Sequence, residues 1–188
     1  KAVTGVVAPM NLAKLEPVIR QRAGWILDDL PTGESFNWVE HVSVELTTQM
    51  LATIFDFPFE QRRKLTQWSD LVTSSVATGG TLPDEDRREG LMQCLSEFTD
   101  LWNERVRWDP REHNDLITLM ANDPATSEMD PMEYLGNLIL LIVGGNDTTR
   151  NSISGGVLGL NQYPAEYQKL TANPGLIPSM IPEIIRWQ

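Results

Sequence analysis

Apolar residues along this chain recur mostly at steps of three and four, the spacing of one face of an α-helix. The clearest series lie in the segments 12–30, 42–54, 60–75, 84–108 and 114–121. Alternation typical of a strand occurs only at Val42–Leu46, inside a segment with helical spacing. The pattern therefore predicts a mainly α-helical protein with no convincing strand.

The segment 130–161 predicts the longest helix. Asp130 suits the N-cap, Pro131 suits the first helical position, and Glu133 can complete a capping box. About thirty residues rising 1.5 Å each give roughly 45 Å, enough to cross a domain. We therefore expect one central helix with the other helices packed around it.

Prolines and glycines set the expected breaks between helices. Proline lacks a backbone donor and is tolerated in the first turn of a helix. We therefore expect Pro17 in the first turn of its helix, and Pro182 at the third position of a helix capped by Ser179. The run Thr78–Pro83, which contains Gly79 and Gly80, predicts a loop.

Composition narrows the class of protein. The 188 residues are 41% hydrophobic and 22% charged, which is ordinary for a globular domain. A net charge of −11 argues against a nucleic-acid surface. The longest apolar stretch, Leu135–Val143, is too short to span a membrane, and the opening residues do not resemble a secretory leader. We expect a soluble, cytoplasmic protein without a membrane span.

A single cysteine, Cys94, excludes a disulfide framework and multi-cysteine metal sites, and it favours a reducing compartment. His41 and His113 are too far apart in sequence to indicate a zinc site. Cys94 lies on the amphipathic segment 84–108, so we expect it to fill core space as a small hydrophobic residue. The apolar stripe of that segment consists of Leu91, Leu95, Phe98, Trp102 and Val106.

The run Gly144–Thr149 interrupts the most apolar predicted helix with two glycines, an acid and two hydroxyls. Each glycine costs a helix interior roughly 1 kcal/mol relative to alanine. We interpret the run as a place where a ligand lies against the backbone beside a proton donor. Taken singly, Thr148 is explained by a bond back to the Gly144 carbonyl, which can open the helix, and Asp147 by pairing with Arg150 or Asn151. Small residues from Ser152 to Gly159 predict a tight helix crossing.

Gly144-Gly145-Asn146-Asp147-Thr148-Thr149 resembles the distal-helix motif of the cytochromes P450, which are haem-thiolate monooxygenases. Glu183-Ile184-Ile185-Arg186 matches the second motif of that family, Glu-x-x-Arg, at the expected place. The run Asn114–Ile117 is similar to the usual approach to the distal helix. The resemblance covers essentially the whole chain.

The resemblance implies haem b as the cofactor, with Gly144 and Gly145 letting the distal helix pass close to it. It implies that Thr148 hydrogen-bonds dioxygen at the haem and that Asp147 relays protons inward. It assigns Glu183 and Arg186 to a structural pair.

The axial cysteine of that family follows the Glu-x-x-Arg helix, so the resemblance places it beyond Gln188 and excludes Cys94. It implies that residues 1–188 are a single partial domain, an internal fragment of a longer protein. The fragment would hold the helical portion of the fold and lack the haem-ligand loop and most of the β-structure. We expect it neither to bind haem tightly nor to turn over substrate alone.

Gly144–Ser152 and Glu183–Gln188 look most like the soluble bacterial alkane hydroxylases. That similarity implies terminal hydroxylation of medium-chain alkanes with O2, with electrons from a ferredoxin and its reductase. Leu138, Leu141 and Ile142 either line a narrow substrate pocket or belong to the core. Sterols, terpenes or fatty acids are alternative substrates. A different class, a non-enzymatic helical domain that binds an apolar ligand or partner helix, also stays open.

Overall fold

The computed structural model describes residues 9–74 and 80–187, with the backbone alone for residues 9–12. These residues form helices and no β-strand, so the mainly α prediction is confirmed. In chain order the elements are α2 (Pro9–Asp28), the π-helix η1 (Val39–Val44), α3 (Glu45–Phe55), the 3₁₀ turn η2 (Phe59–Gln61), α4 (Arg63–Thr73), α5 (Asp84–Arg105), α6 (Leu116–Asn122), α7 (Pro131–Gln162), α8 (Pro164–Ala172), the 3₁₀ turn η4 (Pro174–Leu176) and α9 (Ile177–Trp187).

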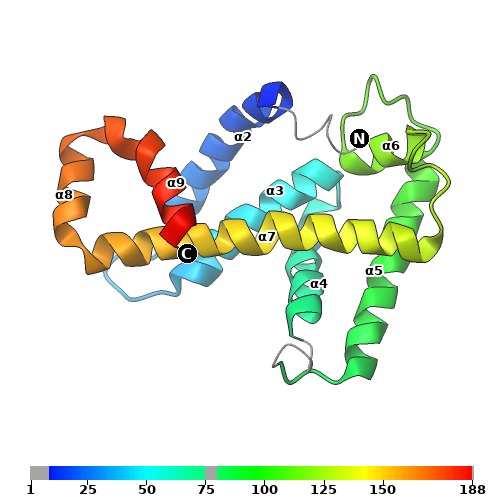
Figure 1. Ribbon diagram of the computed structural model, residues 1–188, viewed down its shortest axis with the longest axis horizontal. Coiled ribbons are helices and arrows are strands. Elements are labelled where there is room, and N and C mark those ends of the chain that lie inside the picture. The colour runs from blue at the N-terminus through cyan, green and yellow to red at the C-terminus, as the bar shows by residue number, and fades with distance from the viewer. Residues whose placement is uncertain (1–8, 75–79, 188) are drawn as a thin grey trace.

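Helix α7 is the axis of the molecule, as the sequence predicts (Figure 1). It contacts η1, α3, α4 and α5 along one part and α8 and α9 near its C-terminal end. The Asp130 carboxylate caps it by accepting hydrogen bonds from the backbone nitrogens of Met132 (2.8 Å) and Glu133 (2.9 Å). The helix ends at Gln162, one residue beyond the expected end.

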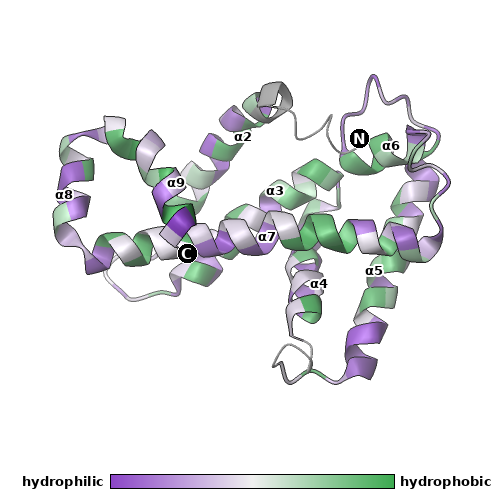
Figure 2. Ribbon diagram, viewed as in Figure 1, coloured by the Kyte–Doolittle hydropathy of each residue, from purple (hydrophilic) through white to green (hydrophobic). Residues whose placement is uncertain are grey.

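The core lies where α7 crosses α3, α4 and α5, and Figure 2 shows the strongly hydrophobic stretch of α7 at this crossing. Phe98 of α5 is fully buried, with its ring 5.4 Å from the rings of both Phe55 and Phe57. Leu138 and Ile142 are also fully buried in this cluster, and Leu141 packs against it. Of the two interpretations of these three residues, the core one is confirmed.

Both proline expectations are wrong. Pro17 lies inside α2, where its exposed position lets water solvate the carbonyl that loses its helical partner. Pro182 lies inside α9, which begins at Ile177. The turn η4 precedes α9 directly, and Ser179 lies inside α9 and donates its hydroxyl back to the Leu176 carbonyl of η4 (2.9 Å) instead of capping the helix.

Other predicted boundaries agree more closely. Helix α4 ends at Thr73 and α5 begins at Asp84, on either side of the predicted loop, although the first two residues of that loop, 78 and 79, lie outside the described part. The apolar stripe of α5 is confirmed at Phe98, which is fully buried, and at Leu91, Leu95 and Trp102, which pack against the core. Val106 is the exception, because it follows the helix and is exposed.

Candidate functional site

The Gly144–Thr149 motif occupies the middle of α7, and the helix is continuous through it. Thr148 donates its hydroxyl to the Gly144 carbonyl oxygen at 2.8 Å, which confirms the predicted back-bond. The opened turn that such a bond can produce does not occur. A carbonyl oxygen has two lone pairs, so it can accept from the hydroxyl without losing its helical hydrogen bond.

The two glycines face different surroundings. At Gly144, no heavy atom of the described residues outside the adjacent helix backbone lies within 4 Å of the position that a Cβ would take. At Gly145 the same position lies 2.8 Å from Cδ2 of Leu51, on α3. Gly145 therefore serves the close packing of α7 on α3, whereas Gly144 leaves open space beside the exposed Thr148.

An apolar groove of about 520 Å³ begins at Thr148 and runs between α7 and α9. Its walls include Thr148, Ser152, Ile153, Ile181, Ile184 and Ile185. The glycine surface, the hydroxyl and the groove thus form one continuous open side of α7. A flat, largely apolar ligand fits such a surface, because no side chain on Gly144 holds it away from the backbone.

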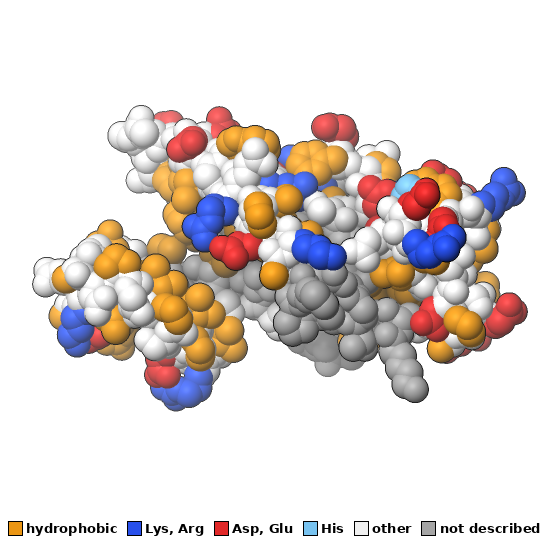
Figure 3. All heavy atoms as spheres, turned by 90° about the horizontal axis from the view of Figure 1, so that it is seen from above, with side chains coloured by type: hydrophobic (Ala, Val, Ile, Leu, Met, Phe, Trp, Pro, Cys, Tyr) orange, Lys and Arg blue, Asp and Glu red, His pale blue; other side chains and the backbone are white. Residues whose placement is uncertain are grey.

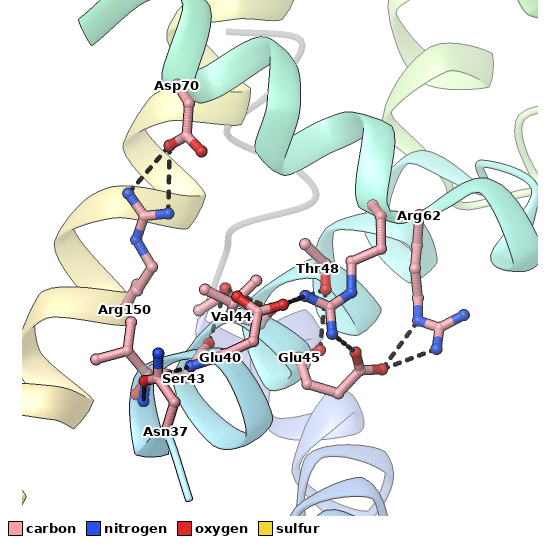
Figure 4. A network of polar contacts seen from close by, with 12 residues as sticks. Asn37, Glu40, Ser43, Val44, Glu45, Thr48, Arg62, Asp70 and Arg150 are labelled. Carbon is pink, nitrogen blue, oxygen red and sulfur yellow. Dashed lines mark hydrogen bonds and ion pairs between the residues drawn. The ribbon is translucent and has the colours of Figure 1, made fainter. Parts of the chain in front are cut away.

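Asp147 is directed away from this side and toward α4. Its Oδ1 accepts hydrogen bonds from Ser69 Oγ (3.0 Å) and Arg150 Nη2 (2.9 Å). Arg150 also bonds Asp70 of α4 at 3.3 Å, and Figure 4 shows this second pair. Pairing of Asp147 with Arg150, one of the alternatives read from the sequence, is confirmed. The structure shows no hydrogen bond between Asp147 and Thr148.

A buried polar neighbour, Asn146, was missed by sequence reasoning. It is fully buried and accepts from Thr47 Oγ1 at 2.9 Å, while its Nδ2 lies 3.4 Å from Oδ1 of Asp147. Ser69 was also missed and is fully buried. The available signal was their polarity on helix faces that are otherwise apolar, since buried polar groups almost always have a partner.

The small residues after the motif form a helix crossing, as predicted. A Cβ at Gly156 would lie 3.1 Å from Ile184 Cδ1, and one at Gly159 would lie 3.7 Å from the Trp187 ring, both on α9. Hydrophobic side chains gather over this α8–α9 end of the molecule, which lies at the left in Figure 3. Exposed members of this surface are Tyr163, Tyr167, Leu176, Ile177, Ile181, Ile185 and Trp187.

Glu183 and Arg186 form an ion pair on α9, and both side chains are mostly exposed. Their mutual hydrogen bonds lower the pKa of the Glu183 carboxyl and raise that of the Arg186 guanidinium. An exposed pair of this kind contributes little to stability, so its structural role depends on what else it contacts.

Cys94 is fully buried in the core, among the residues that contact Leu138 and Ile142. Burial raises the pKa of its thiol to about 12, so it stays protonated at neutral pH. The prediction that it fills core space is confirmed. Within residues 9–74 and 80–187 there is no cluster of three or more His, Cys, Asp or Glu that could hold a metal ion. None of the helices described is long and apolar enough to cross a membrane.

No protein-family model matches the chain. Individual relatives do. The putative cytochrome P450 126 of Mycobacterium tuberculosis is 30% identical over 195 residues, which cover 100% of this chain and 46% of that protein. Linalool 8-monooxygenase of Pseudomonas putida is 28% identical over 99% of this chain and 45% of its own length.

Solved structures agree in fold. CYP153D17 from Sphingomonas sp. PAMC 26605 superposes with a TM-score of 0.88 at 45% identity, over 100% of this chain and 46% of that one. Cytochrome P450-153 from Novosphingobium aromaticivorans gives 0.85 at 38% identity, over 99% and 44%. The chain therefore spans about half the length of the relatives that it matches.

Proposed function

We propose that this chain, which is related to the cytochromes P450 in sequence and in fold, forms the distal wall of the haem site of a monooxygenase. The observation that carries the proposal is the open side of α7, where Gly144, the Thr148 hydroxyl and an apolar groove adjoin. In this proposal residues 1–188 are part of one domain of a longer protein, and the exposed apolar surface of α8 and α9 packs against the rest of it.

Cytochromes P450 use haem b. The residues present fit one face of such a group, because Gly144 allows a planar ligand to reach the backbone and the groove supplies apolar contacts. When bound, haem would supply the oxidising power for inserting one atom of O2 into a C–H bond. We propose Gly144 and Thr148 as cofactor contacts and place the axial thiolate outside this chain. The Glu183–Arg186 pair keeps its proposed structural role.

In this proposal Asp147 takes up protons from water and Thr148 passes them to the haem side. A hydroxyl passes a proton onward without being a strong acid, and a carboxylate takes up its replacement from water. Asp147 faces α4 while Thr148 faces the open side, so a water molecule or a side-chain rotation must connect them.

For the substrate we propose a medium-chain alkane hydroxylated at its terminal carbon, with a ferredoxin and its reductase as electron donors. The support is the likeness of Gly144–Ser152 and Glu183–Gln188 to the soluble bacterial alkane hydroxylases. Relatives named for linalool, vitamin D and a steroid keep terpenes and sterols as the alternative. Turnover assays with octane, linalool and a sterol distinguish these substrate classes.

Gly144→Ala should have different effects on stability in the apoprotein and in the haem-bound protein. In the full-length apoprotein, Gly144→Ala should raise the free energy of unfolding by about 0.5–1 kcal/mol, because alanine favours the helix and its Cβ meets nothing. With haem bound, the gain should disappear and haem affinity should fall, because the Cβ then meets the ligand. Urea unfolding with and without haem measures both.

Gly136→Ala is the matched control, because Gly136 lies on the same helix and is also open at its Cβ position. It should stabilise both forms equally. Equal stabilisation of both forms by Gly144→Ala would contradict haem contact at this face.

The reduced carbon-monoxide difference spectrum of the full-length protein tests the proposed function. We expect the thiolate band, and we expect Cys94→Ser to leave it intact because the buried Cys94 thiol points into the core. Absence of the band in the unmodified protein would favour the non-enzymatic helical domain. Its selective loss in Cys94→Ser would overturn the placement of the axial ligand outside this chain.

A further inference from the structure

The carboxylate of Asp147 is held asymmetrically. Every hydrogen bond that it accepts from the described residues reaches Oδ1: from Ser69 Oγ at 3.0 Å, Arg150 Nη2 at 2.9 Å and, at a longer 3.4 Å, Asn146 Nδ2. No described residue donates to Oδ2. The Asp147 side chain is 17% exposed, so it retains contact with water.

The groups that hold Oδ1 are themselves fixed. Ser69 and Asn146 are both fully buried, and Asn146 is tied to α3 through the hydroxyl of Thr47. The Arg150 side chain is 18% exposed and lies between two acids. One oxygen of Asp147 therefore sits in a rigid cradle made by α4, α7 and, through Asn146, α3.

Arg150 reaches its second acid on the solvent side. Its Nη1 and Nη2 both lie 3.3 Å from Oδ1 of Asp70, whose side chain is 51% exposed. Figure 4 shows Asp70 on α4 meeting Arg150 on α7. The longer distance and greater exposure make this the weaker of the two pairs of Arg150.

We propose that Ser69 and Arg150 are positioning residues for Asp147, which anchor Oδ1 and leave Oδ2 as the oxygen that carries the proton. This inference rests on the proposed monooxygenase function. In the step, Oδ2 accepts a proton from water and releases it to a water or hydroxyl on the Thr148 side. The carboxylate returns to its charged form, and no other bond changes.

The hydrogen-bonding pattern favours Oδ1 as the anchored oxygen and Oδ2 as the oxygen that is protonated. Arg150 and Ser69 donate hydrogens to Oδ1, so a proton arriving at that oxygen would have to displace a donor. Oδ2 accepts a proton without breaking either contact. The anchored oxygen also fixes the direction in which Oδ2 points, which sets the efficiency of the transfer.

A purely structural role for the same contacts, in which they only tie α4 to α7, makes a different prediction. Both Arg150→Gln and Asp70→Asn break the ion pair between the helices, but Asp70→Asn spares every contact to Asp147. A structural tie predicts equal effects of the two substitutions. Positioning of Asp147 predicts an effect of Arg150→Gln alone.

The test uses the full-length haem enzyme. We expect Ser69→Ala and Arg150→Gln each to lower kcat by roughly tenfold and to raise its solvent deuterium isotope effect, with KM little changed. Arg150→Lys, which keeps a donor and the charge, should recover most of the loss. Asp70→Asn and the exposed control Ser96→Ala should retain kcat and the isotope effect.

A readout independent of turnover is the crystal structure of Arg150→Gln, where Asp147 should leave its Ser69 contact or lose its single orientation. Unchanged kcat in Ser69→Ala and Arg150→Gln, or equal losses in Asp70→Asn and Arg150→Gln, would overturn the inference. The proposed function is tested separately by Thr148→Ala, which should divert electrons from product to hydrogen peroxide. If that diversion is seen while Ser69 and Arg150 prove unimportant, the inference alone fails. If Thr148→Ala also has no effect, the proposed function fails with it.

Discussion

Asp147→Asn is expected to lower kcat of the full-length enzyme by roughly 100-fold, because an amide cannot take up and release a proton as a carboxyl group does. KM should change little, since Asp147 faces α4 and does not line the apolar groove. The amide oxygen can still accept from Ser69 and Arg150, so the fold around the site should persist. Steady-state kinetics at saturating substrate measure the effect.

Asp70→Asn is the matched control for this substitution, because it removes a carboxylate from the same network without removing Asp147 or any hydrogen bond that Asp147 accepts; of that network, the Asp70 carboxylate contacts only Arg150. Its turnover should stay within about twofold of the unmodified enzyme. If Asp147→Asn keeps near-normal kcat, Asp147 carries no essential proton and its contacts with α4 are structural.

The helix that bears the site was predictable because its signals are local. Asp130, Pro131 and the end before Pro164 lie within a few residues of the bonds that they make, so the sequence alone predicts both ends of α7 closely. The Thr148 back-bond to Gly144 is local in the same way.

The two proline predictions failed because they used only the rule that proline belongs in the first turn of a helix, whereas the surroundings of each proline decided its position. The start of α9 is set by the preceding turn η4, which places Ile177 in helical conformation and leaves Pro182 inside the helix. Pro17 is tolerated inside α2 because its position is exposed. A rule that considers only the missing donor predicts neither outcome.

The cradle of Asp147 was not predictable, because its donors come from distant parts of the chain. Ser69 lies 78 positions from Asp147, and Thr47 lies 99 positions from Asn146. Such pairs form only when α3 and α4 pack on α7. The burial of Leu138 and Ile142 likewise depends on this packing, which is why the sequence left pocket and core as alternatives.

Thr148→Ala is expected to leave haem binding and O2 consumption in place while diverting most of the electrons to hydrogen peroxide. In the structure the hydroxyl donates to the Gly144 carbonyl, so its oxygen remains free to accept a hydrogen bond at the open side of α7. Without this hydroxyl, water is the remaining source of protons at the open side of α7, and no side chain fixes the position of that water. We expect the yield of product per electron to fall roughly tenfold.

Thr171→Ala is the matched control, because Thr171 is an exposed helical threonine whose hydroxyl makes the same type of back-bond, to the Tyr167 carbonyl at 3.1 Å on α8. It should leave coupling unchanged, and Thr148→Ser should preserve most of it by keeping the hydroxyl. Parallel measurements of NADH consumed, peroxide formed and product formed separate the outcomes. If Thr148→Ala still converts all consumed electrons into product, the only role left for the Thr148 hydroxyl is its hydrogen bond to the Gly144 carbonyl. The open side of α7 would then contribute apolar contacts but no proton chemistry.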